Sequence, residues 1–424
     1  MKRRHLILGN GPAGVVAAET LARYAPNDEI LLYGCEGVPP YSRMAIPYFL
    51  EGQINEQGTW LRKGEDHFAR LGITLSEGRA VAVDQAAKRV LFADGTSSDY
   101  DTLLIATGSS PLLPPIPGID LPGVTPCWTL AEARTIAKRL KPGVRVVQMG
   151  AGFIGAILLE TFVQKGAQLT VVEVGDRMVP RMLTPRAGNL LRRWVEARGV
   201  AVRTGCRIEA IAPAADSPLL VRLSSGEELA ADLVIVAAGV RPNISFLAGT
   251  TIQRESGILV DAGMRTSDPA IFAAGDCAQA PDLLTGQQVV AAIQPNAVDQ
   301  GRVAAIQMAG GQACLPGVLA INVLDTLGLV ATSFGQWQGV AEEAGGSGVE
   351  WCDEARFSYI SLQFQEDRLI GATTVGFSEH TGVLRGLIQG RVRLGPWHER
   401  LLAQPLAFVE AFLARAHYPA LLAA

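Results

Sequence analysis

The sequence is poor in charged residues and shows no excess of basic ones. Asp, Glu, Lys and Arg together make up 18% of its 424 residues, and the formal net charge is −4 at pH 7. Nucleic-acid-binding surfaces normally need a strong excess of Lys and Arg, which replace the counterions on phosphate. The composition therefore argues against a nucleic-acid partner.

The cysteines are few and unpaired in sequence. There are six, with no Cys-x-x-Cys or similar spacing. This excludes a disulfide framework and a metal site with the usual ligand spacing. We therefore expect no metal ion, and mostly reduced, structural thiols at Cys35, Cys127, Cys206, Cys277, Cys314 and Cys352.

Long hydrophobic runs are also missing near the start of the chain. The basic residues 2–4 are followed by an apolar run that meets Gly9 within a few residues, which is too short for a membrane span or a secretion signal. We therefore expect a cytoplasmic protein without membrane contact. With 424 residues, 48% of them hydrophobic, the chain is long enough for two or three domains.

A glycine fingerprint occurs twice in the sequence. Residues 5–14 read as a short apolar strand that runs into Gly-Asn-Gly-Pro-Ala-Gly and then a helical pattern, and residues 144–155 repeat this arrangement. Such glycines permit a tight turn, close approach of a pyrophosphate and close helix packing. One isolated match is weak evidence, because ordinary strand-turn-helix junctions share the pattern. The duplication makes two dinucleotide-binding units the main organisational prediction.

Each fingerprint is followed by a strand that ends near a carboxylate. Glu36 follows the apolar run 29–33, and Glu173 closes the run 169–173, 23 residues after Gly150. A carboxylate there accepts hydrogen bonds from ribose hydroxyls and repels a 2′-phosphate, so Glu173 predicts a preference for NADH, which Arg177 would soften. For Glu36 a surface loop charge remains an alternative. Arg43 is either a phosphate clamp or a solvated loop arginine.

Other segments predict the rest of the fold. Buried strands run into small-residue turns at 106–108, 237–239 and 273–276, residues 79–95 read as an antiparallel excursion, and antiparallel strands are expected at 357–364 and 369–375. The prediction is an α/β fold with two doubly wound Rossmann-like domains and a C-terminal α+β domain. The expected bounds are 1–118 with 246–324 for the first domain, 119–245 for the second, and 325–424 for the third.

These motifs resemble the pyridine nucleotide-disulfide oxidoreductase superfamily along essentially the whole chain. The resemblance implies that the first domain binds FAD, the second binds NAD(H), and the last is an interface domain. It assigns FAD contacts to Gly9, Gly11, Pro12, Ala13, Gly14, Glu36, Arg43, Val81, Ala106, Thr107, Gly108, Gly275, Asp276, Asn296 and Ala297. It assigns NAD contacts to Gly150, Gly152, Phe153, Ile154, Gly155, Glu173 and Gly239.

The departures from the superfamily pattern restrict the chemistry. Met44 stands where the coenzyme A disulfide reductase branch has a redox cysteine, and a thioether cannot form a thiolate nucleophile. Tyr48 and Ile157 replace a Lys–Glu pair that many members have near the flavin, and Glu160 is either a polar group near the nicotinamide or a plain helix-face residue. The resemblance therefore implies flavin-based redox chemistry without a catalytic side chain, with Tyr48 and Glu160 as candidates for groups near the flavin and the nicotinamide.

The branch resembled most is that of NADH-linked FAD subunits of electron-transfer complexes, such as those of phenylglyoxylate dehydrogenase and tungsten aldehyde oxidoreductase. It implies electron exchange between NADH and an iron-sulfur partner within an oligomer or hetero-complex. Three alternatives stay open: a free-standing rubredoxin or ferredoxin reductase, an NADH oxidase or peroxidase, which Met44 argues against, and a structural flavoprotein subunit with an idle nucleotide site. A basic cluster near Trp397 is either a docking surface or an ordinary solvated face; it comprises Arg385, Arg391, Arg393 and Arg400.

Overall fold

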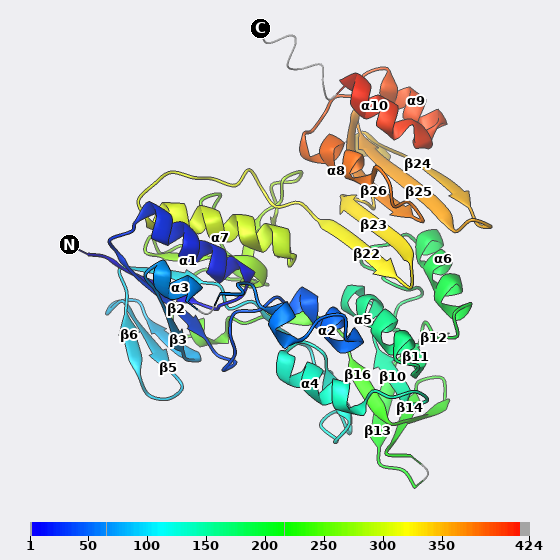
Figure 1. The fold of residues 1–424 in the computed structure, drawn as a ribbon. Coiled ribbons are helices and arrows are strands. Elements are labelled where there is room, and N and C mark those ends of the chain that lie inside the picture. Colours follow the sequence, from blue (N-terminus) through cyan, green and yellow to red (C-terminus); the bar gives the residue numbers. More distant parts are fainter. Residues whose placement is uncertain (1, 65, 216, 416–424) are drawn as a thin grey trace. The chain divides into compact units, whose positions relative to one another are not determined.

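The computed structural model describes residues 2–64, 66–215 and 217–415 (Figure 1). The chain forms two compact units, each assembled from two separate stretches of sequence. The first unit comprises residues 1–110 and 240–319, and the second comprises residues 111–239 and 320–424.

A five-stranded parallel sheet is the centre of the first unit. Its order is β19-β7-β1-β2-β3. Leu6, Ile7 and Leu8 of the central strand are almost completely buried, as expected for a parallel sheet that is covered on both faces. The strands are β1 (Arg4–Leu8), β2 (Glu29–Gly34), β3 (Ile73–Glu77), β7 (Thr102–Ile105) and β19 (Ile271–Ala273).

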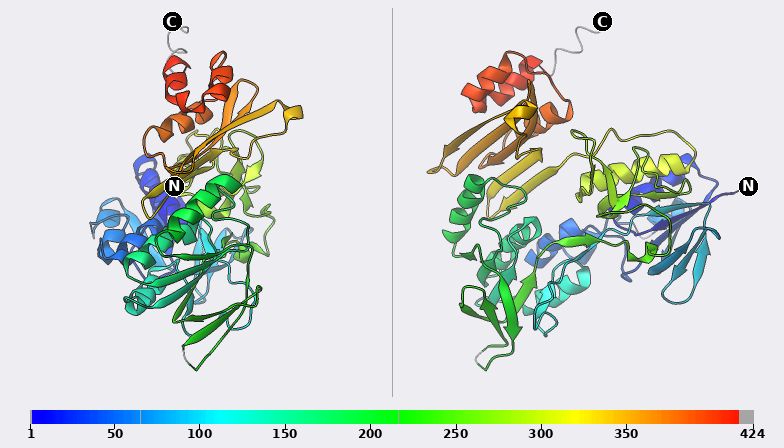
Figure 2. Two further views of the ribbon diagram at one scale, coloured as in Figure 1. Left: turned by 90° about the vertical axis from the view of Figure 1, so that its right-hand side faces the viewer. Right: turned by 180° about the vertical axis from the view of Figure 1, so that it is seen from behind.

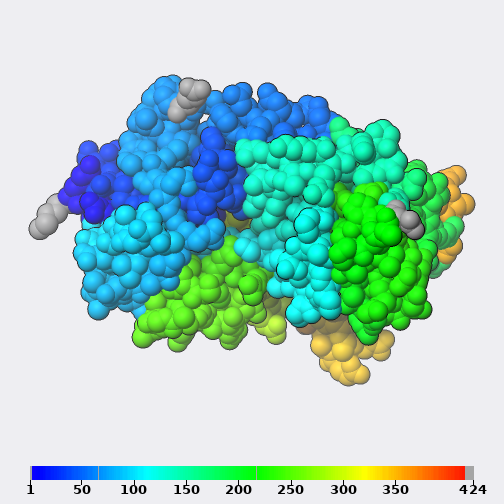
Figure 3. Space-filling view, turned by 90° about the horizontal axis from the view of Figure 1, so that it is seen from below, coloured from blue at the N-terminus to red at the C-terminus, as the bar shows by residue number. Residues whose placement is uncertain are grey.

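Two long helices, α1 (Pro12–Tyr24) and α7 (Gln294–Met308), lie side by side in this unit (Figure 1). Their close approach requires a glycine, because a Cβ at Gly301 would lie 2.4 Å from the carbonyl oxygen of Ala13. The antiparallel excursion packs through Phe92, whose ring stacks on Tyr33 of β2 at 4.5 Å. It comprises β4 (Ala80–Asp84), β5 (Arg89–Phe92) and β6 (Ser97–Asp99), and it forms part of the surface in Figure 3.

The remaining elements of the first unit are short. The strand at 258–259 is only two residues long, and it pairs with β20, outside the five-stranded parallel sheet. These elements are α2 (Ile46–Glu51), α3 (His67–Arg70), β17 (Val240–Pro242), β18 (Ile258–Leu259), β20 (Ala278–Pro281) and β21 (Gln288–Val289). Strand β8 (Ser109–Pro111) begins in this unit and ends on the first residue of the second.

The second unit contains another five-stranded parallel sheet, in the order β12-β11-β10-β16-β9. Its strands are β9 (Val124–Pro126), β10 (Arg145–Met149), β11 (Gln168–Val172), β12 (Ala201–Arg203) and β16 (Leu233–Val236). The helices are α4 (Leu130–Arg139), α5 (Phe153–Gln164) and α6 (Pro185–Glu196), and a side sheet contains β13 (Ile208–Ala212), β14 (Leu219–Leu223) and β15 (Glu228–Ala231). Both units therefore repeat the predicted strand-helix-strand arrangement.

The last stretch of the second unit is an antiparallel sheet with helices beside it (Figure 2). The sheet order is β22-β23-β26-β25-β24. The strands are β22 (Ile321–Thr326), β23 (Leu329–Gly335), β24 (Gly346–Asp353), β25 (Ser358–Gln365) and β26 (Arg368–Val375), and the helices are α8 (Thr381–Gln389), α9 (Trp397–Ala403) and α10 (Phe408–Arg415). Within the unit, the Thr184 hydroxyl at the start of α6 donates to the Tyr359 hydroxyl of β25 at 2.8 Å.

The predicted fold class is therefore confirmed. The parallel sheets with their helices and the α+β region after residue 320 are as expected. The chain passes from one compact unit to the other after residues 110, 239 and 319. The subdivision of the second unit into a nucleotide domain and a C-terminal domain, with bounds at 119–245 and 325–424, stays a prediction.

Candidate cofactor sites

The first fingerprint forms a tight cradle between β1 and α1. Gly9 has φ +109°, and a Cβ there would lie 2.1 Å from the carbonyl oxygen of Ala106. A Cβ at Gly14 would lie 1.8 Å from the carbonyl oxygen of Gly9, whereas Gly11, the residue before the helix, has nothing within 4 Å of its Cβ position. The outer glycines are thus needed for packing. The middle one leaves space beside the helix N-terminus, which suits a pyrophosphate.

The second fingerprint repeats this geometry between β10 and α5. Gly150 has φ +100°, and a Cβ there would lie 2.4 Å from the carbonyl oxygen of Ala237. A Cβ at Gly155 would also lie 2.4 Å from a carbonyl oxygen, that of Gly150, and Gly152 again has nothing within 4 Å. Phe153 and Ile154 begin α5, as Pro12 and Ala13 begin α1. Both cradles therefore fit a dinucleotide by the same physical test.

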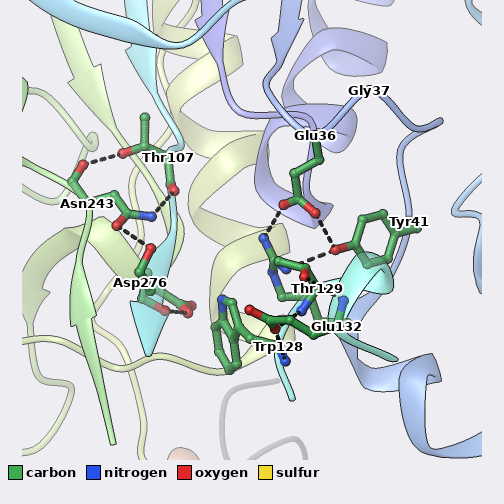
Figure 4. A network of polar contacts seen from close by, with 12 residues as sticks. Glu36, Gly37, Tyr41, Thr107, Trp128, Thr129, Glu132, Asn243 and Asp276 are labelled. Carbon is green, nitrogen blue, oxygen red and sulfur yellow. Dashed lines mark hydrogen bonds and ion pairs between the residues drawn. The ribbon is translucent and has the colours of Figure 1, made fainter. Parts of the chain in front are cut away.

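The carboxylate after β2 is held by side chains. The Tyr41 hydroxyl donates to Oε2 of Glu36 at 2.7 Å, and Nη2 of Arg43 donates to Oε1 at 2.6 Å (Figure 4). The Glu36 side chain is 26% exposed, so a ligand can reach it. The sequence left Arg43 as either a phosphate clamp or a solvated loop arginine. In the structure its guanidinium is hydrogen-bonded to the carboxylate of Glu36. Tyr41 was not predicted as a site residue.

The carboxylate after β11 is held by the backbone. The Ala151 N–H donates to Oε2 of Glu173 at 2.7 Å, and the Gly175 N–H donates to Oε1 at 2.7 Å. Glu173 is 7% exposed. An ionised carboxylate has about four lone-pair positions, so each oxygen can accept a further hydrogen bond, for example from a ribose hydroxyl.

The turns that follow β7 and β19 lie at the same edge of the first sheet, because these strands are parallel neighbours. Gly108 has φ +64° and Gly275 has φ +79°, so both turns use left-handed backbone. Asp276, the expected ligand of a polyol chain, accepts a hydrogen bond from the Ser109 hydroxyl at 2.7 Å. The edge thus gathers the predicted Ala106, Thr107, Gly108, Gly275 and Asp276.

Two residues that were not assigned from sequence support these turns. The Asn243 amide donates to the Thr107 carbonyl at 3.0 Å, while the Thr107 hydroxyl donates to the Asn243 carbonyl at 2.8 Å (Figure 4). Gln300 is 1% exposed, and its Oε1 accepts from the Gly275 N–H at 2.7 Å. Gln300 is on α7, 25 residues from its partner, so no local sequence pattern links the two.

Helix α7 begins at Gln294, after the N-cap residue Ile293. Asn296 is buried, and its side-chain amide donates to the Leu319 carbonyl at 3.2 Å. The side chain of Asn296 therefore holds the segment after the helix. The expectation that Asn296 and Ala297 contact the flavin stays a prediction that rests on the helix N-terminus.

The other predicted site residues are scattered. Tyr48 on α2 is 52% exposed and Val81 on β4 is 48% exposed. Glu160 accepts a hydrogen bond from Gln164, one turn along α5, at 2.9 Å, as a helix-face glutamate does. Gly239 has φ +112°, and its carbonyl accepts from Leu112 at 2.9 Å. The cofactor roles of these residues stay predictions.

The thiols differ widely in exposure. Cys35 and Cys314 are exposed, whereas Cys277 is completely buried, with its sulfur 3.3 Å from the Ile105 carbonyl oxygen. Burial raises the pKa of Cys277, and it raises the pKa of Cys127 to about 12. Both thiols therefore stay protonated and poorly nucleophilic. Met44 is 51% exposed.

Neither a candidate metal cluster nor a candidate membrane-spanning helix occurs in the described part of the chain. Within residues 2–64, 66–215 and 217–415, no group of three or more His, Cys, Asp or Glu side chains could hold a metal ion. Of the helices in this part of the chain, none has both the length and the apolar character that crossing a membrane requires.

The fold and the two cradles define a two-dinucleotide oxidoreductase. The chain belongs to the pyridine nucleotide-disulphide oxidoreductase family, whose sequence model matches residues 3–313. This confirms the predicted superfamily, and with it the prediction of an FAD-dependent enzyme that uses NAD(H).

Three relatives show how far the similarity extends. The chain is 33% identical over 408 residues to the epsilon subunit of NADH-dependent phenylglyoxylate dehydrogenase from Aromatoleum evansii, covering 95% of this chain and 96% of the relative. It is 30% identical to a rubredoxin-NAD(+) reductase from Pseudomonas putida, covering 91% and 98%. The crystal structure of a ferredoxin reductase for the CYP199A2 system from Rhodopseudomonas palustris matches with a TM-score of 0.83 and 29% identity, covering 91% and 94%.

Proposed function

We propose that this protein exchanges electrons between NADH and an iron-sulfur protein, as the FAD-containing subunit of an aldehyde or 2-oxoacid oxidoreductase complex. The observation that carries the proposal is the pair of glycine cradles, each tightly packed at its first and third glycines and open at its second. If the second nucleotide site were idle, a larger residue could stand at position 152. The glycine found there leaves the space beside the helix N-terminus open for a ligand.

The first unit would hold FAD. The backbone N–H groups at the start of α1 would bind the pyrophosphate next to Gly11, and Glu36 would accept hydrogen bonds from the adenosine ribose. The turn at Gly275 and Asp276 would hold the ribityl chain, with Gln300 and Ser109 fixing that turn. When bound, FAD supplies the conversion between two-electron exchange with nicotinamide and one-electron exchange with iron-sulfur centres.

The second unit would hold NADH in the same way. The N–H groups at the start of α5 would bind its pyrophosphate, and Glu173 would accept from the adenosine ribose. Two backbone N–H groups fix the orientation of the Glu173 carboxylate, so the carboxylate could not rotate away from a 2′-phosphate and would repel it. This supports the preference for NADH over NADPH.

The relatives support an iron-sulfur partner. One is a subunit of an NADH-dependent dehydrogenase complex, and others are named as reductases of rubredoxin and ferredoxin. The relative from the complex is matched over 96% of its length. This coverage supports a hetero-complex as the first candidate, and we expect it in the cytoplasm. A free-standing reductase of a diffusible iron-sulfur protein is the second candidate, supported by the 98% coverage of the rubredoxin-NAD(+) reductase.

The partner can be tested by purifying the chain from its own cells through an affinity tag. We expect subunits that contain iron and acid-labile sulfide to co-purify, and their clusters to be reduced by NADH only when this chain is present. Purification of the chain alone, followed by rapid NADH-dependent reduction of added rubredoxin or ferredoxin, would favour the free-standing reductase. Failure to reduce any iron-sulfur protein would contradict both.

A further inference from the structure

We propose that Tyr41 is a positioning residue for FAD, which acts by holding the carboxylate of Glu36 in the orientation that accepts the adenosine ribose. This inference rests on the proposed FAD site. Tyr41 was not predicted as a site residue. The inference also gives the contact between Arg43 and Glu36 a role, as the second hydrogen bond that holds the carboxylate.

The three side chains form a closed triangle of hydrogen bonds. Tyr41 donates its hydroxyl hydrogen to one oxygen of Glu36 at 2.7 Å, and Arg43 donates to the other oxygen at 2.6 Å. Arg43 also donates through Nη1 to the Tyr41 hydroxyl oxygen at 2.9 Å. Because each carboxylate oxygen has its own donor, the carboxylate cannot rotate without breaking a charge-assisted hydrogen bond, and such bonds are about twice as strong as neutral ones.

Tyr41 is the fixed member of the triangle. It is 7% exposed, whereas the Arg43 side chain is 35% exposed. The backbone around Tyr41 is bound to a neighbouring segment on both sides. Leu61 N–H donates to the Pro40 carbonyl at 2.9 Å, and Ser42 N–H donates to the Thr59 carbonyl at 2.9 Å. With its ring buried and its backbone paired, Tyr41 loses little further freedom when it holds Glu36.

The same short loop also reaches the start of α7, where the Ser42 hydroxyl donates to Oε1 of Gln294 at 3.0 Å. Its residues thus contact two parts of the proposed FAD site, the ribose carboxylate and the first residue of α7. A carboxylate that is already oriented avoids an ordering cost when ribose hydroxyls bind, so the expected effect of Tyr41 is on FAD affinity.

The test uses the full-length protein, freed of flavin, with two ligands: FAD and an FAD analogue whose adenosine ribose lacks the 2′-hydroxyl. Affinities are measured by quenching of flavin fluorescence. We expect Tyr41→Phe, which removes only the hydroxyl, to weaken FAD binding about tenfold. The analogue should be weakened clearly less, because its ribose has one donor fewer for Glu36.

Two further variants complete the experiment. Glu36→Gln should weaken FAD binding, and the Tyr41→Phe, Glu36→Gln double variant should bind FAD no more weakly than the worse single variant, because both changes act through one carboxylate. Tyr24→Phe, at a tyrosine that is 53% exposed at the C-terminal end of α1, is the matched control and should bind FAD like the wild type.

Three results would overturn the inference while leaving FAD binding intact: Tyr41→Phe leaves FAD affinity unchanged, it weakens both ligands equally, or its effect adds fully to that of Glu36→Gln. Failure of the wild-type chain to bind FAD is a distinct result. It would overturn the proposed function, and this inference with it.

Discussion

The two glycine cradles are nearly the same, but the carboxylates beside them are supported in different ways. Glu36 is partly exposed and is held by the side chains of Tyr41 and Arg43. Glu173 is buried and is held by the backbone N–H groups of Ala151 and Gly175. The second carboxylate is therefore part of the hydrogen bonding of its fold, whereas the first depends on a loop whose side chains can be changed separately. Beside the same fingerprint, a ligand-binding carboxylate can therefore contribute strongly to the stability of the fold, as Glu173 does, or only weakly, as Glu36 does.

The largest expected effects come from the third glycine of each cradle. Gly14→Ala should give protein without FAD, and it should destabilise the first unit by about 2 kcal/mol, because the added Cβ would meet the Gly9 carbonyl. Gly155→Ala should keep FAD but lose NADH binding. The ratio of flavin to protein absorbance, NADH titration and thermal unfolding measure these outcomes.

The middle glycines provide the matched controls. Gly11→Ala and Gly152→Ala add a Cβ where nothing lies within 4 Å. They should leave thermal unfolding unchanged and weaken only FAD and NADH binding, respectively. Loss of FAD from Gly155→Ala together with NADH binding by Gly14→Ala would reverse the assignment of the two sites.

The carboxylates should differ in how strongly they affect stability. Glu173→Ala leaves two backbone N–H groups without their acceptor, so we expect a loss of about 2 kcal/mol in the free energy of unfolding. It should also lower kcat/KM for NADH more than for NADPH and so narrow the gap between them. Glu36→Ala should lower FAD affinity with a smaller loss of stability. Comparable kcat/KM values for NADH and NADPH in the wild type would contradict the role of Glu173.

The central strands of the two sheets should respond to pH in different ranges. His5 on β1 is completely buried between Thr102 and Asp28, and burial lowers its pKa, which favours the neutral form in the folded chain. The unfolded chain takes up a proton near pH 6.5, so the first unit should lose stability as the pH falls from about 7 to 5. On β10, the hydrogen bond from Arg145 lowers the pKa of Asp232 to about 2, so this contribution is lost only as the pH falls below about 4.

Hydrogen exchange of peptides from β1 and β10 distinguishes the two ranges. Protection of β1 should fall first on acidification, and His5→Gln should remove that early loss. Equal loss of protection in both strands between about pH 7 and 5 would show that His5 does not set the difference.

A smaller effect is expected from the basic cluster near Trp397. Nη1 of Arg393 lies 3.4 Å from the carboxylate of Asp367, so the cluster has an acidic neighbour, and Arg400 lies over the Trp397 ring at 4.3 Å. Arg391→Glu combined with Arg393→Glu should leave NADH-driven flavin reduction unchanged. It should slow transfer to the iron-sulfur partner at low ionic strength, and salt should mask the defect.

The exposed Arg356, on the turn after β24, offers a matched control for this cluster. Its side chain is 84% exposed, and Arg356→Glu should leave the transfer rate unchanged. Equal rates for the Arg391, Arg393 double variant and the wild type at low ionic strength would place the docking surface elsewhere.

The smallest expected effect is that of thiol alkylation on the wild type. The exposed Cys35 and Cys314 should be modified first, with little loss of NADH-to-dye activity, because the proposed reaction uses no thiolate. Met44→Cys should gain thiol sensitivity. Stoichiometric loss of wild-type activity with one alkylated cysteine would show that a thiol is needed.

Much of the fold could be predicted because its signals are local. The glycine spacing and the apolar runs identified both cradles, and carboxylates at strand ends identified Glu36 and Glu173. Residues that act from other segments could not be found in this way. Gln300 meets Gly275 only through the packing of α7, and Asn243 meets Thr107 across 136 residues. Tyr41 was visible in the loop before Arg43, but sequence does not show which way a loop side chain points. The pairing of β18 with β20 also depends on tertiary contacts.

We expect both cradles to be in use, one for FAD and one for NADH. The most direct test is to add a stoichiometric amount of NADH to the purified, FAD-loaded protein without oxygen and to record the flavin absorbance. We expect rapid loss of the oxidised-flavin band in the wild type and little change in Gly155→Ala, with a chemical reductant bleaching both. Flavin that stays oxidised with NADH in the wild type, yet is bleached by the chemical reductant, would contradict the use of the second cradle by NADH.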